Sequence, residues 1–233
     1  MFLPIQYLLS QLQSMAQDFS RDPVAFLITN VLRAAAVLMA ITFHEVAHGY
    51  VAFRCGDPTA KMLGRLSLNP LKHLDVLGTL SLFFLGFGWA KPVPVNPRNF
   101  SNYRRDDFLV SVAGVVTNLT LFIIATAFTV GLYRHVNSDF LYYVLLFFSM
   151  FASINLGLGV FNLLPIPPLD GFHVLNDTLL GGRLRLTPQL FQISHIILLV
   201  LMFSGAFSQI LSTVMSAIQS GVVNMFMRLT GAA

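Results

Sequence analysis

The sequence predicts an all-α polytopic membrane protein with about four to six transmembrane helices, and a small β or re-entrant region between the first two confident spans. Only 10% of its 233 residues are charged, whereas an average soluble domain has about a quarter. Hydrophobic residues make up 55%, and the mean hydropathy is +0.72. Several apolar runs reach the roughly 20 residues that a spanning helix needs. This composition argues against a soluble enzyme.

The net charge, the cysteine count and the length exclude several kinds of partner and site. The net charge of +4 does not gather in a basic stripe away from the membrane flanks, so we expect no nucleic-acid partner. A single cysteine, Cys55, excludes an intramolecular disulfide and a cysteine zinc cluster. The length fits one compact unit, and we expect residues 23–233 to form a single membrane-embedded domain.

Residues 1–22 predict an amphipathic helix that lies in the membrane interface. Apolar side chains recur at helical spacing with glutamines between them, and several glutamines would be hard to place in lipid. The segment has no basic n-region, so it does not resemble a signal peptide. Asp22-Pro23 then marks a break and the start of a helix.

The first confident span covers about Val24–Phe53 and contains the motif HEVAHG, residues 44–49. Ionisable side chains at membrane depth indicate a functional site. On a helix, His44 and His48 share one face one turn apart, where they can hold one zinc ion. Glu45 is then free to act as a general base. His48 precedes the interfacial Arg54 by six residues, which places it roughly 9 Å inside the membrane.

The region after this span is predicted to be cytoplasmic. It holds eight of the fourteen basic residues: Arg54, Lys61, Arg65, Lys72, Lys91, Arg98, Arg104 and Arg105. The apolar run Val76–Trp89 between them is too short for an ordinary span and predicts a re-entrant or interfacial segment. Gly64–Pro70 predicts a short strand, and the proline-rich segment 89–97 predicts extended backbone. Such an edge near a metal site can pair with a substrate backbone, although a plain connecting loop is the alternative.

Two further spans are predicted at about Phe108–Tyr133 and Phe140–Leu164. The last of these ends in NLLPIPPLDG, where three prolines break the helix just before Asp170. The final apolar stretch, Pro188–Met227, is too long for one typical span, and Ser204-Gly205 is expected to kink or divide it. The sequence leaves open whether this stretch crosses once or twice.

A hydrolytic zinc ion usually takes three protein ligands, so the motif needs one more. The candidates are Asp170, His173, Asp177, Asp75, His73, His135 and His195. Asp170 is favoured because it follows an irregular helix end on the same side of the membrane as His48. His173 is the second choice. His135 is predicted on the opposite side, and His195 has the apolar neighbours of an ordinary packed histidine.

Four motifs together resemble the site-2 protease family of intramembrane zinc metalloproteases, in its minimal branch without PDZ or CBS domains. They are HEVAHG, GRLSLNPLKHLDVLGTL, AKPVPVN and NLLPIPPLDG. The resemblance covers about residues 26–176, which we take as the catalytic core. It implies one Zn²⁺ ion held by His44, His48 and Asp170, with Glu45 as catalytic acid and base. It also implies that Asn162 helps to hold the substrate backbone.

One motif departs from the family pattern. The family often has AGP-x-x-N in the next span, and residues 113–118 here are AGVVTN. The missing proline bears on local helix geometry rather than on the zinc chemistry.

The resemblance implies an endopeptidase that hydrolyses peptide bonds within or near transmembrane segments of membrane-anchored proteins. Its partners would be that protein substrate and the lipid bilayer. We expect a multi-pass protein of the inner, or cytoplasmic, cell membrane, with its active site nearer the cytoplasm. Two alternatives use the same ligands: a membrane metal transporter or sensor, and an inactive scaffold that binds membrane helices. The sequence names no substrate, cleavage site, regulator or oligomeric state.

Overall fold

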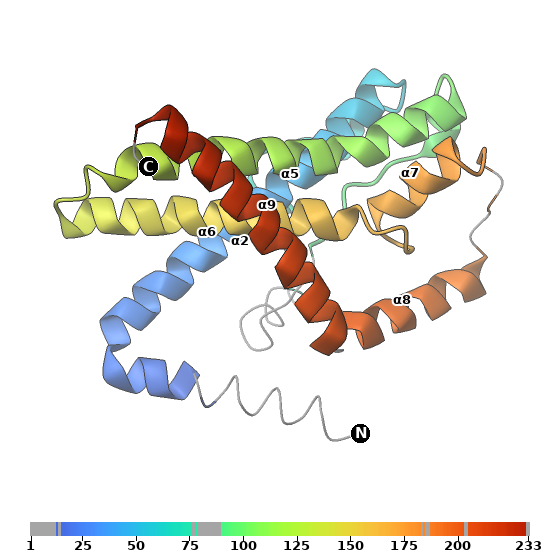
Figure 1. Ribbon diagram of the computed structural model, residues 1–233. Coiled ribbons are helices and arrows are strands. Elements are labelled where there is room, and N and C mark those ends of the chain that lie inside the picture. The colour runs from blue at the N-terminus through green and yellow to red at the C-terminus, as the bar shows by residue number, and fades with distance from the viewer. Residues whose placement is uncertain are drawn as a thin grey trace.

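The computed structural model describes residues 13, 15–75, 78, 90–182, 184, 187–202 and 205–231. In this part of the chain the regular structure is helical, and the one β contact is an isolated bridge between Leu74 and Ala90. Four helical segments are long and apolar enough to cross a membrane: Pro23–Arg54, Tyr103–Tyr133, Asp139–Asn162 and Phe207–Leu229. The predicted all-α polytopic class is therefore confirmed (Figure 1).

Helix α2 (Pro23–Arg54) begins where the sequence predicts. The Asp22 carboxylate accepts hydrogen bonds from the amides of Val24 (3.1 Å) and Ala25 (2.9 Å), and Pro23 follows as the first helical residue. The helix ends at Arg54, and Gly56 then turns the chain with φ of 106°. A side chain there would be strained by this φ and would approach the Asn99 carbonyl oxygen.

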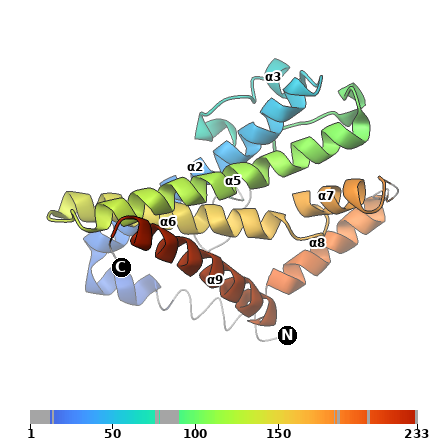
Figure 2. The same ribbon diagram turned by 45° about the horizontal axis from the view of Figure 1, so that its top comes forward.

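Helices α5 (Tyr103–Tyr133) and α6 (Asp139–Asn162) run alongside each other, and α2 crosses both (Figures 1 and 2). Small residues let the helices approach closely, as expected where lipid offers no hydrophobic driving force. The buried core where they meet consists of Ala36, Ala40, Phe122, Ala125, Phe151, Ala152 and Leu156. This core fixes the position of α2 relative to the other spans.

The short helix α7 (Asp170–Thr178) follows the proline-rich break after α6. Gly171 is required here, because a Cβ atom on it would run into the backbone of Leu163 and Leu164. The glycine thus lets the broken segment fold back against the start of α7. As a result, Asp170 is the first residue of a helix rather than part of a loop.

The final apolar stretch forms two helices, α8 (Pro188–Met202) and α9 (Gly205–Leu229). The expected division near Ser204-Gly205 is confirmed, although Ser204 itself lies outside the described residues. The two helices meet in a V, and α9 packs on α5 and α6 (Figures 1 and 2). Of the pair, α9 alone contains a segment that meets the length and hydropathy of a span.

The predicted strand at Gly64–Pro70 is wrong: these residues form bends between α3 (Thr59–Met62) and the 3₁₀ turn η1 (Pro70–Lys72). Side chains of the residues that follow this segment bind backbone carbonyls that a partner strand would otherwise satisfy. Lys72 Nζ donates to the Gly64 carbonyl (2.9 Å), and His73 Nε2 bonds the Ser67 carbonyl (2.8 Å). The loop 91–96 is non-helical as predicted and leads to η2 (Pro97–Asn99).

Two expectations fall largely outside the described residues. Of the expected interfacial helix 1–22, the structure describes residue 13 and the continuous stretch 15–22, in which 15–21 are helical. Of the expected re-entrant segment 76–89, it describes Gly78. Both expectations stay predictions.

Candidate metal centre

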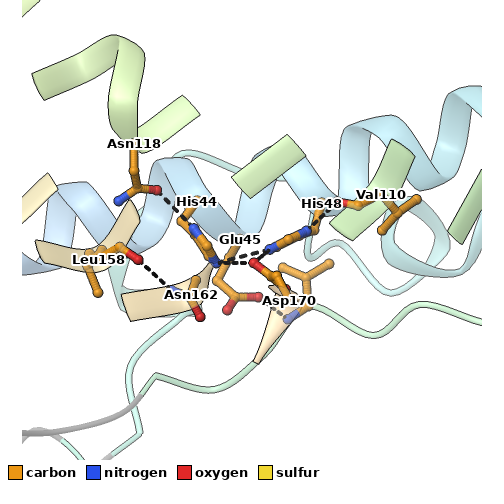
Figure 3. A network of polar contacts seen from close by, with 9 residues as sticks. His44, Glu45, His48, Val110, Asn118, Leu158, Asn162 and Asp170 are labelled. Carbon is orange, nitrogen blue, oxygen red and sulfur yellow. Dashed lines mark hydrogen bonds and ion pairs between the residues drawn. The ribbon is translucent and has the colours of Figure 1, made fainter. Parts of the chain in front are cut away.

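Three side chains from two distant parts of the sequence converge at one point (Figure 3). Helix α2 places His44 and His48 one turn apart, with 3.0 Å between their Nε2 atoms. Asp170 reaches them from the start of α7, its Oδ2 atom 3.4 Å from His44 Nε2 and 3.3 Å from His48 Nε2. These are the three residues that the sequence analysis proposes as metal ligands. In the described part of the chain they form the only group with this geometry.

The hydrogen bonds behind the histidines decide which ring nitrogens face this point. His48 Nδ1 lies 2.7 Å from the Val110 carbonyl oxygen, and His44 Nδ1 lies 2.9 Å from Asn118 Oδ1. A carbonyl oxygen only accepts, so in the neutral rings Nδ1 carries the proton and Nε2 presents a lone pair. Hydrogen bonds from a second partner fix metal-binding histidines in this way.

The donor set fits a bound cation. Asp170 Oδ2 is buried and has no hydrogen-bond partner among the described residues. Two ring lone pairs and a carboxylate oxygen that face one another carry no proton between them, which is costly unless a cation lies among them. Ligands at about 2.1 Å from a tetrahedral zinc ion are about 3.4 Å apart, close to the observed 3.0–3.4 Å. Two imidazoles and a carboxylate are also ligands that zinc prefers.

One face of α5 supports the histidine pair. Val110, Gly114 and Asn118 are spaced four residues apart, so they lie along the same side of the helix. A Cβ atom on Gly114 would overlap His44 and His48, so only glycine fits beneath their rings. From the sequence alone, Gly114 and Asn118 are connected only with the family motif, and their contact with the histidines is missed. The available signal was an asparagine within an apolar span, since a polar side chain at membrane depth needs a partner.

Glu45 lies beside the converging group and is oriented by the loop 91–96 (Figure 3). The Val93 amide donates to Glu45 Oε2 at 2.7 Å. One turn after Glu45, Gly49 leaves room for Val93, since a Cβ atom on Gly49 would lie 2.9 Å from Val93 Cγ1. The last residue of HEVAHG therefore lets the loop rest directly on the helix.

Asp57 ties the same loop to the end of α2. Its side chain is fully buried and accepts hydrogen bonds from the Asn96 amide (2.7 Å) and from Asn99 Nδ2 (2.7 Å). Burial alone would raise the pKa of the Asp57 carboxyl, but these bonds and those from Thr59 outweigh it and hold the pKa below its usual value. The loop is thus anchored at two points, Asp57 and Glu45.

The structure places the other candidates elsewhere. His173, the second choice for a ligand, bonds Asp107 through Nδ1 (3.0 Å). His73 Nε2 bonds the Ser67 carbonyl, and His195 Nδ1 bonds the Phe191 carbonyl of its own helix. Asp75, Asp177 and His135 do not join the metal-ligand group within the described residues.

Asn162 is the last residue of α6, where its Nδ2 donates to the Leu158 carbonyl at 3.0 Å. Figure 3 shows it at the edge of the network around His44 and Glu45. Its expected contact with a substrate backbone stays a prediction.

Comparisons with known proteins identify the family of the chain. A family model described as peptidase family M50 matches residues 135–205, a range that includes Asp170 and Asn162. A Bacillus subtilis protein named "Putative zinc metalloprotease YwhC" is 39% identical over 193 residues, which is 82% of this chain and 88% of the relative.

Two mycobacterial proteins, both named "Putative zinc metalloprotease Rip2", are also similar. The protein of Mycolicibacterium smegmatis is 28% identical, covering 80% of this chain and 72% of the relative. That of Mycobacterium tuberculosis H37Rv is 30% identical, covering 77% and 70%. No solved structure matches the chain. With a relative this similar along nearly its whole length, the chain belongs to peptidase family M50, the site-2 proteases, and is a multi-pass zinc metalloprotease.

Proposed function

We propose that this protein is an intramembrane endopeptidase with one catalytic zinc ion, held by His44, His48 and Asp170. Its substrates would be membrane-anchored proteins, cut within or near a transmembrane segment. The observation that carries the proposal is the buried Asp170 oxygen, which meets both histidines on a helix long and apolar enough to cross the bilayer. Such a site favours a substrate that is itself in the membrane.

The residues around the centre divide the chemistry between them. When bound, zinc supplies a Lewis acid that polarises the scissile carbonyl and lowers the pKa of water. The Glu45 carboxylate, oriented by the Val93 amide, takes a proton from the attacking water and gives it to the leaving amine. Asn162 is placed in this scheme as a donor that holds the substrate backbone or its developing oxyanion.

The loop 91–96 is the proposed surface for the substrate. A helical substrate hides its carbonyls behind its own hydrogen bonds, so it must unwind locally before it can be cut. Pairing with a non-helical edge would compensate for the lost bonds. The loop suits this role because it is non-helical and contacts Glu45 directly.

The basic residues after α2 support an orientation with this loop on the cytoplasmic side of the inner membrane. The centre would then lie inside the bilayer but nearer the cytoplasm, because His48 precedes the end of α2 at Arg54 by less than two turns. We assign residues 23–233 to one membrane-embedded domain, with the catalytic core at about 26–176.

Replacing Glu45 by Gln tests the proposal. The variant should keep zinc, since Glu45 is not a ligand, but should no longer cleave. The measurement is proteomics of the membrane fraction from cells with the wild type or the variant, followed by cleavage of an identified substrate in proteoliposomes. Undiminished cleavage by the variant would contradict the proposal. Zinc transport without cleavage would favour a transporter, and a purified chain without zinc would favour a scaffold.

A further inference from the structure

Helix α7 carries three ionisable side chains on one face, at Asp170, His173 and Asp177. Their spacing of three and four residues aligns them along the helix. Asp170 faces the histidine pair, whereas His173 Nδ1 lies 3.0 Å from Oδ2 of Asp107 on α5. Asp177 is only 3% exposed, and neither of its carboxylate oxygens has a hydrogen-bond partner among the described residues. The protease chemistry described above uses neither His173 nor Asp177.

Contacts with α5 hold α7 in place. At its C-terminal end, Arg104 donates from Nε to the Asp177 carbonyl (2.5 Å) and from Nη2 to the Thr178 carbonyl (3.3 Å). The residue before the helix, Leu169, offers no side-chain cap. A helix of nine residues is too short to be stable alone. The direction in which Asp170 points therefore depends on the contacts between α7 and α5.

His173 lies where two buried acids face it. Its hydrogen bond to Asp107 outweighs burial and raises the pKa of the imidazole, which favours the charged form. Burial and the neighbouring Asp107 carboxylate raise the pKa of Asp177 to about 6. Without the imidazolium, two poorly solvated carboxylates of like charge would oppose each other across the contact between α5 and α7.

We propose that His173, held by Asp107, is a positioning residue that fixes α7 against α5 so that Asp170 reaches the metal. This inference rests on the proposed function, because it takes Asp170 to be a zinc ligand. His173 acts at a distance: it touches neither metal nor substrate, and its effect should appear first in how firmly zinc is held. Partners that orient metal ligands typically contribute about 10- to 100-fold in metal affinity.

The test measures zinc stoichiometry and the rate of zinc release to a chelator, using the full chain purified in detergent. The absorption spectrum of the cobalt-substituted protein reports ligand geometry in the same samples. His173→Leu should release zinc about tenfold faster than the wild type and shift the cobalt spectrum. His195→Leu is the matched control, because among the described residues the hydrogen bond of His195 stays within α8, and it should behave as the wild type does.

Two rescue variants separate positioning from simple packing. His173→Asn places an amide nitrogen near the position of Nδ1, so it should retain the bond to Asp107 and most of the slow zinc release. His173→Leu combined with Asp177→Asn removes the opposed charges, so it should release zinc more slowly than His173→Leu alone. A role in packing volume alone predicts no rescue in either variant.

A second pair covers the case in which His173→Leu does not fold. Asp107→Asn weakens the charge attraction, whereas Asp106→Asn changes the adjacent acid, which accepts from the Asn102 amide at the start of α5. Only Asp107→Asn should speed zinc release.

The two proposals fail in different ways. If the wild type holds zinc and the folded His173 and Asp107 variants release it at the wild-type rate, the positioning role is wrong and the proposed function stands. A wild-type chain that holds no zinc overturns both.

Discussion

His44 and His48 lie one turn apart on a spanning helix of 32 residues, whereas Asp170 begins a helix of only nine. The spacing within HEVAHG is enough to bring the two histidines together. Asp170 is brought to them by the proline-rich break, by the close approach of Gly171 to the backbone before it, and by hydrogen bonds between α5 and α7. The histidine half is thus built locally, and the aspartate half depends on tertiary contacts. Helix α5 touches both halves, so it is the element through which they are aligned.

The largest effect should come from removing one ligand from either half. His48→Ala and Asp170→Ala should each lose zinc and reduce kcat/KM by at least about a thousandfold. The measurements are metal content and cleavage of a membrane substrate. Equal losses from the two variants would show that both halves are needed despite their different construction. A zinc content of one ion per chain in Asp170→Ala would remove Asp170 from the site.

A smaller effect is expected from the α5 surface beneath the histidines. Gly114→Ala would push a methyl group into His44 and His48, so the zinc affinity should fall by roughly a hundredfold and the protein should lose about 1–3 kcal/mol of stability. Gly131→Ala is the matched control on the same helix, because a Cβ atom there meets nothing within 4 Å. Unchanged zinc affinity in Gly114→Ala would mean that the two histidine rings can move away from the added methyl group without loss of zinc binding.

The hydrogen bond behind His44 should contribute less. Asn118→Ala leaves the His44 Nδ1 proton without its acceptor, and the zinc affinity should fall by about tenfold. Asn155→Ala also removes a buried asparagine, but within the described part of the chain that side chain bonds only the Phe151 carbonyl of its own helix. It should lower stability and leave zinc affinity unchanged, so equal zinc affinities in the two variants would contradict the orienting role of Asn118.

The smallest effect concerns Asp177 and depends on pH. Its pKa is raised from 3.8 to about 6, so between these values the folded chain binds more protons than the unfolded one. Asp177 therefore destabilises the fold above about pH 6 and has no such effect below about pH 4. Asp177→Asn should raise the unfolding temperature at pH 7.5 and change it little near pH 4. Thermal unfolding in detergent at both pH values is the check, and a stabilisation that is independent of pH would contradict it.

The sequence predicts elements whose cause is local. An apolar run of sufficient length and the Asp22-Pro23 start signal place α2 to within one residue at each end. Helices α5 and α6 are also predicted, although the predicted span begins later than α5 does, because the first residues of α5 are polar. The strand predicted at Gly64–Pro70 is wrong because the side chains of Lys72 and His73, and not a neighbouring strand, bind backbone carbonyls of this segment.

For the centre, the sequence identifies the three residues that converge, but it does not predict what holds them. The contacts of Asn118 with His44 and of Asp107 with His173 join residues 74 and 66 positions apart. No helical or strand periodicity relates residues at such separations. A contact of this kind becomes visible only when the spans are packed together.

The double anchoring of the loop 91–96 has a consequence for inhibitor design. A compound that inserts against Gly49 and lifts Val93 away would free Glu45 from its orienting amide, and it would not need to bind the metal. A ligand of this kind would recognise the side chains and backbone of the loop and of α2 rather than the ion.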